Sequence, residues 1–265
     1  MKIDDRMKQY EYVTRTYLPI RMPVIIRIDG KAFHSFTKGF ERPYDNVLAN
    51  AMNTTMKELV ANIQGCVFGY VQSDEISLLL KNDQTIDTSA WFDNNVSKMI
   101  SISASMATLY FNNAFSYEVN EYNEAWNIDN NILRAYHKAE DKGALFDSRV
   151  FVVPEEEVVN YFIWRQEDAT RNSIQMLGQC NFPHKQLQGL NTGDIQNKLF
   201  TEKGINWNDM PTGFKRGRAA YREPVEVETP NGIVKRNKVI VDKEIPIFKE
   251  CRYFIAYKYI KNQEV

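Results

Sequence analysis

The sequence contains little cysteine and little histidine. Its 265 residues include three cysteines, Cys66, Cys180 and Cys251, and three histidines. The cysteines are widely spaced, form no CxxC pair and have no histidine pair near them, so we expect neither a disulfide framework nor a zinc site. A chain of this length can bury a substantial apolar core without such crosslinks. We therefore interpret the cysteines as reduced thiols of a cytoplasmic protein.

The sequence also lacks a long apolar run and an excess of charge of one sign. No stretch approaches the length of a membrane helix, and the first residues, MKIDDRMKQYEYVTR, are polar, so we expect neither a secretory signal nor a membrane partner. The 33 basic and 34 acidic side chains nearly cancel, which argues against binding nucleic acid through bulk charge alone. One local basic cluster is typical either of a nucleic-acid patch or of an ordinary solvated surface. Its members are Lys215, Arg216, Arg218, Arg222, Lys235, Arg236 and Lys238.

Apolar patterns in the first eighty residues predict a strand, a helix and a hairpin. The β-branched run 23–29 ends at an Asp-Gly pair and is typical of a buried strand. Asp45 is expected to cap a helix, because apolar residues follow it at helical spacing over 48–63. Two strand-like runs within 66–80 are separated only by Ser73-Asp74-Glu75, so they are expected to pair as a hairpin.

The later patterns predict a second helix, a further strand and a third helix. We expect a helix over 89–111, an irregular connection over 112–129, and a strand over 149–153 that is followed by a helix starting at Pro154. The tail from Pro224 is expected to form one or two hairpins, with 230–232 as a turn. This order of elements predicts an α+β fold: an antiparallel sheet with helices packed on one face. No repeat, low-complexity segment or linker is found, so we expect one catalytic domain over 1–265.

Acidic residues end the first predicted strand and occupy the predicted hairpin turn. If these elements are neighbours in one sheet, Asp29 and Asp74 project from the same edge, with Glu75 beside them. Two adjacent carboxylates repel each other unless a cation neutralises them. Magnesium needs only a few hard oxygen ligands, so two acids and a backbone carbonyl such as that of Gly30 suffice. Two ions held in this way can activate a hydroxyl nucleophile and stabilise a departing pyrophosphate. The spacing alone leaves open that each acid is an ordinary turn residue.

The loop Gly30–Phe36 contains groups that suit a nucleotide. Its glycine and free amides can cradle phosphate, Lys31 can neutralise it, and Phe33 or His34 can stack on a base. The loop is neither a Walker loop nor a Rossmann fingerprint. By itself, a lone histidine such as His34 is more typical of a structural or surface position than of a nucleotide contact.

Taken together, six motifs resemble the tRNA-histidine guanylyltransferase superfamily, in family order. They are Arg27–His34, Gln72–Glu75, Ser97-Lys98, Phe146–Arg149, Trp164–Gln166 and Asn197–Phe200. The resemblance implies a palm like that of polymerases and nucleotide cyclases, with a palm core over about 20–180 and a tRNA-contacting C-terminal extension over about 181–265. It also implies a homotetramer.

The activity implied by the resemblance is templated 3′-to-5′ addition of nucleotides, chiefly guanosine, to tRNA 5′ ends, including repair of 5′-truncated tRNAs. The substrates would be tRNA, ATP and GTP, and the 5′ end would first be activated with ATP or GTP. Asp29, Asp74 and the Gly30 carbonyl would hold two magnesium ions, and Glu75 would be a supporting acid. The implied nucleotide contacts are Lys31, Ala32, Phe33, His34, Arg42, Ser73, Lys98 and Asn197.

The chain departs from the family pattern at two places. Members dedicated to histidine tRNA carry a His-Ile-Asn-Asn-type motif where this chain has 168–174, so the chain is more similar to the bacterial and archaeal guanylyltransferase-like branch. Asn94 and Asn95 stand where basic residues are expected, so some triphosphate contacts must come from elsewhere. Two alternatives stay open: a nucleotide cyclase, which would make cyclic nucleotide without RNA, and an inactive RNA-binding module.

Overall fold

A twisted antiparallel sheet forms the centre of the protein. The structure is a computed structural model that describes residues 1–125, 129–229 and 232–261. In these ranges the sheet has six strands in the order β4-β1-β3-β2-β5-β6, and every neighbouring pair is antiparallel. The α+β class with an antiparallel sheet is thus confirmed. The strands are β1 (Val24–Gly30), β2 (Cys66–Gln72), β3 (Glu75–Leu80), β4 (Phe146–Val152), β5 (Arg218–Thr229) and β6 (Gly232–Asp242).

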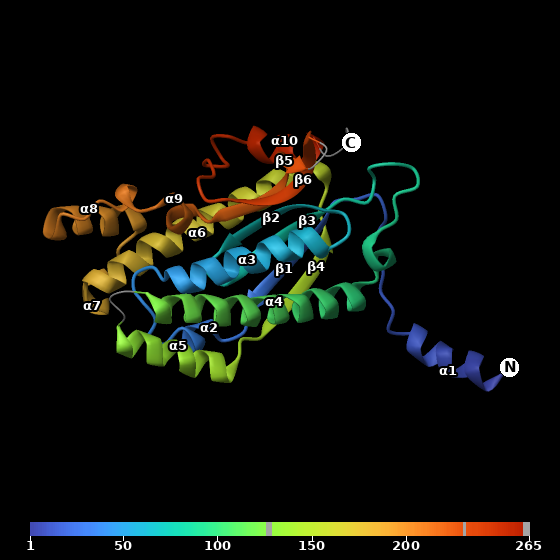
Figure 1. The fold of residues 1–265 in the computed structure, drawn as a ribbon, viewed down its shortest axis with the longest axis horizontal. Helices are drawn as coiled ribbons and strands as arrows, with labels where there is room; N and C mark the ends of the chain where they lie inside the picture. Colours follow the sequence, from blue (N-terminus) through green and yellow to red (C-terminus); the bar gives the residue numbers. More distant parts are fainter. Residues whose placement is uncertain (126–128, 230–231, 262–265) are drawn as a thin grey trace.

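One layer of helices packs on the face of the sheet to which the even-numbered residues of β1 contribute their side chains. α3 (Asn46–Asn62) and α4 (Val96–Glu124) cover this face in Figure 1, with α2 (Phe33–Phe36) and α5 (Asn130–Lys142) beside them. Asp45 caps α3 as predicted, because its Oδ1 accepts a hydrogen bond from the Leu48 amide at 2.8 Å. The shared core includes Ile26, Met56 and Phe111, none of which is exposed.

A long helix covers the opposite face of the sheet. α6 (Val158–Asn181) packs through Phe162 on Ile25, Phe68 and Leu79, and α10 (Tyr253–Lys261) joins the same core. The expectation of helices on one face only was therefore wrong. Residues 24–26 and 78–80 are apolar and buried at successive positions, so both faces of these strands need a covering layer.

The chain between β3 and β4 differs most from the sequence prediction. The expected helix over 89–111 is a short 3-10 turn η1 (Trp91–Asn94) followed by α4, and α4 runs through most of the expected irregular connection to Glu124. Phe92, Asp93 and Asn94 all have positive φ angles, which interrupts the helix before Asn95 caps α4. Residues 126–128 of the expected connection lie outside the described part.

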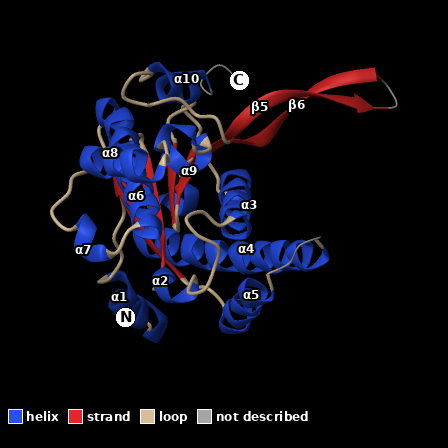
Figure 2. Cartoon of the chain, turned by 90° about the vertical axis from the view of Figure 1, so that its left-hand side faces the viewer, coloured by secondary structure: helices blue, strands red, loops and turns tan. Residues whose placement is uncertain are grey.

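The C-terminal segment packs on α6 and then returns to the sheet. Trp207 and Leu199 bury a small core against the second half of α6. The β5–β6 hairpin starts inside the sheet and then projects from the body as an arm (Figure 2). Residues 230 and 231 of its predicted turn are outside the described part. The remaining elements are α1 (Ile3–Tyr12), η2 (Glu155–Glu157), α7 (His184–Leu187), α8 (Thr192–Lys203), η3 (Trp207–Asp209) and α9 (Thr212–Arg216). In the described ranges, no helix has the length and apolarity to cross a membrane.

Candidate active site

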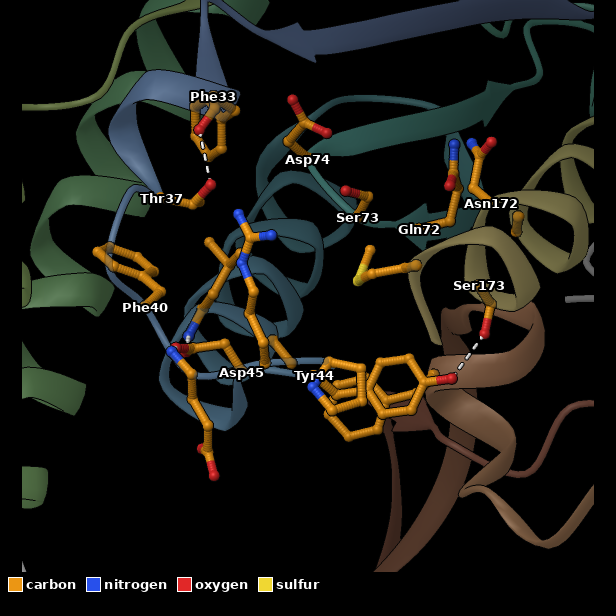
Figure 3. Close-up of a pocket in the computed structure, with 18 of the residues that line it drawn as sticks. Phe33, Thr37, Phe40, Tyr44, Asp45, Gln72, Ser73, Asp74, Asn172 and Ser173 are labelled. Atoms are coloured by element: carbon orange, nitrogen blue, oxygen red, sulfur yellow. Dashed lines mark hydrogen bonds between the residues drawn. The ribbon is translucent and has the colours of Figure 1, made fainter. Parts of the chain in front are cut away.

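A cavity of about 580 Å³ opens at the edge of the sheet where β1 ends and β2 turns into β3. Its walls come from α2, the start of α3, the second half of α6, α9 and the first residue of β5. Figure 3 shows Asp74 at one end of this cavity and Tyr44 at the other. A cavity of this size is in the range that holds small-molecule ligands.

The β2–β3 turn places Asp74 against the end of β1. Gln72 pairs with Glu75, which leaves Ser73 and Asp74 as a two-residue turn with a positive φ of 47° at Ser73. The Gly30 amide donates a hydrogen bond to the Asp74 carbonyl at 3.1 Å. A Cβ at position 30 would lie 2.3 Å from the Phe33 ring, so only glycine fits there. The predicted residues Asp29, Gly30 and Asp74 are thus brought together.

Burial and neighbouring carboxylates raise the pKa of both aspartates and so disfavour their ionisation. The pKa of Asp74 is raised mainly by burial, and the charge of Asp29 raises it further, while a hydrogen bond from Ser73 opposes the shift. The pKa of Asp29 is also raised mainly by burial and then by Asp147, which lies opposite it on β4. A cation between the carboxylates would relieve this cost.

The donor set of this site suits a hard cation that takes few protein ligands. Among the described residues, no group of three or more His, Cys, Asp or Glu side chains could hold a metal ion. Asp29 and Asp74 therefore offer two carboxylates that backbone, water and phosphate oxygens would have to supplement. This combination fits magnesium, which binds through one or two carboxylates plus substrate phosphates.

Glu75, by contrast, is neutralised within the protein. Its Oε1 lies 2.9 Å from Arg165 Nε on α6, although the angle is unsuitable for a hydrogen bond, and its Oε2 lies 3.8 Å from Arg27 Nε. Burial nevertheless raises the pKa of Glu75, because the two guanidinium groups offset only part of the desolvation. Glu75 does not line the cavity. It connects the turn that carries Asp74 to α6.

Five of the eight predicted nucleotide contacts line the cavity: Ala32, Phe33, His34, Arg42 and Ser73. The ring of Phe33 is only 5% exposed and packs against Phe36, Phe111 and Phe146. Little of the Phe33 ring is therefore open to a base, and the stacking of Phe33 or His34 on a base stays a prediction. His34 is exposed at the same wall.

Lys31, Lys98 and Asn197 do not line the cavity. Lys31 is exposed just beyond β1, and Asn197 is exposed on α8. Lys98 lies at the start of α4, with its Nζ 5.9 Å from the Phe92 ring centroid. Nucleotide contacts by these three residues stay predictions.

Sequence reasoning missed the residues at the other end of the cavity, which we call the Tyr44 end: Tyr44, Ser173, Gly213, Phe214 and Arg218. The rings of Tyr44 and Phe214 stack at 4.7 Å, and the Tyr44 hydroxyl lies 3.0 Å from Ser173 Oγ. These residues come from distant segments with no shared motif, so only the tertiary fold reveals them.

The basic cluster predicted over 213–238 is not one surface patch. Lys215 is buried, and its Nζ donates to the Asn208 carbonyl. Arg218 is buried in the cavity wall, whereas Lys235, Arg236 and Lys238 are exposed on the arm.

Comparisons with known proteins agree on one family. A family model described as tRNAHis guanylyltransferase matches residues 4–154. The tRNA(His) guanylyltransferase of Schizosaccharomyces pombe is 29% identical over 84% of this chain and 81% of its own. A probable tRNA(His) guanylyltransferase of Dictyostelium discoideum is 27% identical over 91% of this chain and 93% of its own.

Solved structures show the same likeness over nearly the whole chain. A bacterial tRNA(His) guanylyltransferase-like protein in complex with ATP is 45% identical, with a TM-score of 0.81 over 97% of this chain and 98% of its own. A second bacterial structure, in complex with GTP, is 41% identical, with a TM-score of 0.79 over the same shares. The tRNA(His) guanylyltransferase of Saccharomyces cerevisiae is 26% identical, with a TM-score of 0.65 over 88% of this chain and 96% of its own.

Proposed function

Because the chain belongs to the tRNA(His) guanylyltransferase family and is a nucleotidyltransferase, we propose that it adds nucleotides, chiefly guanosine, to tRNA 5′ ends in the 3′-to-5′ direction. The proposal includes templated repair of 5′-truncated tRNAs. It rests on one observation: Gly30 and Asp74 line a nucleotide-sized cavity, and Asp29, next to Gly30 on β1, is near enough for its charge to act on Asp74.

The proposed reaction has two transfers. In the first, the 5′ phosphate of the tRNA attacks the α-phosphate of ATP or GTP, and pyrophosphate leaves. In the second, the 3′ hydroxyl of an incoming nucleotide attacks the activated 5′ phosphate, a new phosphodiester bond forms, and the nucleoside monophosphate leaves with the electron pair of the broken bond. A tRNA that already carries a 5′ triphosphate needs only the second transfer, which then releases pyrophosphate.

The sheet edge with Asp29, Gly30, Ser73 and Asp74, which we call the Asp74 end, would organise these transfers together with Glu75, Arg42 and His34. Asp29, Asp74 and the Gly30 carbonyl would hold two magnesium ions, which when bound supply positive charge to the attacking and departing oxygens. Glu75 would act through position, because its ion pair with Arg165 ties the turn to α6. Arg42 and Ser73 would bind phosphate oxygens, and His34 would contact the base or the ribose.

The bacterial relatives support the choice of substrates. Two of them have been solved in complex with ATP and with GTP, and both align with nearly all of this chain. The absence of the histidine-tRNA motif near 168–174 supports a substrate range wider than histidine tRNA. The homotetramer and the cytoplasmic location remain part of the proposal.

The test is to incubate the protein with magnesium, ATP, labelled GTP and matched full-length and 5′-truncated tRNAs, and to map the end that grows. Asp29→Asn and Asp74→Asn should each lower magnesium-dependent incorporation by at least about a hundred-fold, as expected for loss of groups at a metal site. Both variants should keep a cooperative melting transition.

Asp147→Asn is the matched control. Asp147 lies opposite Asp29 in the sheet, but its carboxylate is largely exposed, so its loss should leave incorporation within a few-fold of the parent. Full activity of Asp29→Asn or Asp74→Asn would refute the proposal. Cyclic nucleotide made from GTP without RNA would favour a cyclase instead.

A further inference from the structure

Arg218 is a buried cation in the wall of the cavity. It is the first residue of β5 and pairs with Val71, so its side chain points toward α3. Only 5% of the residue is exposed, yet it lines the cavity. A guanidinium in such a place must have its donors satisfied by the protein or by a ligand.

The protein satisfies Arg218 only in part. Its Nε donates to Asn53 Oδ1 at 2.7 Å, and its Nη1 donates to the Gly213 carbonyl at 3.0 Å. Both acceptors are neutral, and within the described residues no carboxylate forms a salt bridge with this side chain. Burial lowers the pKa of Arg218 to about 10. Burying a charge with only neutral partners is unfavourable, so an acceptor brought by an occupant of the cavity would stabilise the guanidinium.

The neighbours of Arg218 suit a nucleobase better than a phosphate. Gly213 leaves room for this side chain, because a Cβ there would lie 2.9 Å from Arg218 Cδ. The next residue, Phe214, stacks on Tyr44. Acidic groups that suit a metal and phosphates lie at the Asp74 end, whereas the Tyr44 end combines flat aromatic rings with guanidinium donors.

We propose that Arg218 is a specificity-determining residue that donates hydrogen bonds to the acceptor edge of a purine in the cavity. Guanine presents N7 and O6 as acceptors, and adenine presents N7 beside the N6 donor. Arginine donors therefore favour GTP over ATP and both over pyrimidine nucleotides. The inference rests on the proposed function, since it identifies which base that same cavity selects.

Arg222 provides a matched control on the same strand. It projects from the same face of β5 as Arg218, and its Nη2 also donates to α3, at 3.2 Å from the Val60 carbonyl and 3.1 Å from the Ala61 carbonyl. It is partly exposed and does not line the cavity. Arg222→Gln therefore removes an arginine contact between β5 and α3 without touching the cavity.

The experiment measures equilibrium binding of GTP, ATP, UTP, 7-deaza-GTP and guanosine to the full chain. The parent protein should bind GTP best and should lose affinity for 7-deaza-GTP, which lacks the N7 acceptor. Arg218→Gln should weaken GTP binding by about ten- to a hundred-fold, the range of a hydrogen bond to a charged group. It should also erase the penalty against 7-deaza-GTP, whereas Arg222→Gln should keep the order of the parent.

Three outcomes would overturn the inference. One is an Arg218→Gln protein with the nucleotide order of the parent. Another is an Arg218→Gln protein that loses the same affinity for every nucleoside triphosphate but none for guanosine. That result would assign Arg218 to the phosphates. The third is a parent protein that binds GTP and 7-deaza-GTP equally, a result that stands even if Arg218→Gln does not fold. Failure of the proposed function looks different: the parent would then add no nucleotide to any tRNA.

Discussion

The two ends of the central sheet bury polar side chains in different ways. At the end where β3 finishes, the partners lie within the chain: Lys81 Nζ is 3.5 Å from Asp83, and Asn94 Nδ2 donates to the Pro19 carbonyl at 2.9 Å. At the Asp74 end, Asp29 and Asp74 are close together and have raised pKa values. At the first end the polar side chains find most of their partners within the chain, with Asn82 Oδ1 as a buried exception, whereas the second end keeps two carboxylates that a cation can neutralise.

The largest expected effect tests the ion pair between Arg165 and Glu75. Arg165→Met would leave Glu75 buried beside only the distant Arg27 guanidinium, and it would leave Arg171 as the ion-pair partner of Asp168. We expect a loss of about 3–5 kcal/mol in the free energy of unfolding, the usual result of breaking a buried ion pair. This corresponds to a fall in Tm on the order of 10 °C, measurable by calorimetry.

The double variant Arg165→Met, Glu75→Gln distinguishes the effect of the lost ion pair from the effect of changed packing around residue 165. Without the unpaired carboxylate, it should recover part of the lost stability. If the single variant melts at the same temperature as the parent, Arg165 does not stabilise buried Glu75, and the proposed contrast between the two ends of the sheet is lost.

A smaller effect is expected at the opposite end. Asn95 caps α4 by accepting a hydrogen bond from the Lys98 amide at 3.1 Å, so Asn95→Ala should cost about 1 kcal/mol in urea unfolding. Nucleotide addition should be unchanged, because this end lies away from the cavity. Asn113→Ala, an exposed position on the same helix, is the control for the loss of an asparagine. If Asn95→Ala loses activity and Asn113→Ala does not, the start of α4, which carries Lys98, takes part in the reaction.

The smallest expected effect is a pH dependence set by the Asp74 end. Asp29 and Asp74 have pKa values raised above the ordinary 3.8, so the folded state holds their protons more tightly than the unfolded chain does. Their contribution to the free energy of unfolding therefore falls as pH rises above about 4. Without metal, Asp74→Asn should melt slightly higher than the parent at neutral pH, and the difference should shrink toward pH 4.

Magnesium provides the matching control for this pH effect. It should raise the Tm of the parent at neutral pH but not that of Asp74→Asn, because it binds the ionised carboxylates of the folded state. If magnesium does not change the Tm of the parent, Asp29 and Asp74 do not bind it, and the proposed contrast between the two ends of the sheet is lost.

Local sequence signals were sufficient for the elements that position the acids. The β-branched run before Asp29, the short turn at Asp74 and the cap at Asp45 each act over a few residues, and each appears as predicted. The start of α4 could not be predicted, because the positive φ angles at 92–94 depend on tertiary contacts such as Leu18 to the Asn94 carbonyl. Likewise, the continuation of α4 past residue 111 depends on packing rather than propensity.

The candidate site divides along the same line. Asp29, Gly30 and Asp74 could be identified as candidates from the sequence, because each lies at the end of a locally encoded strand or in a short turn. The Tyr44 end was not, because its contacts join residues far apart in the chain: Tyr44 meets Ser173 at a separation of 129 residues, and Asn53 meets Arg218 at 165. The burial of the Phe33 ring was equally hidden, since its aromatic neighbours include Phe111 and Phe146.

The projecting arm shares its backbone with the cavity. β5 is one uninterrupted strand: Arg218 stands in the cavity wall at its first residue, and the same strand later leaves the body paired with β6 (Figure 2). A molecule that bound the arm would therefore contact the same continuous strand that begins in the cavity wall.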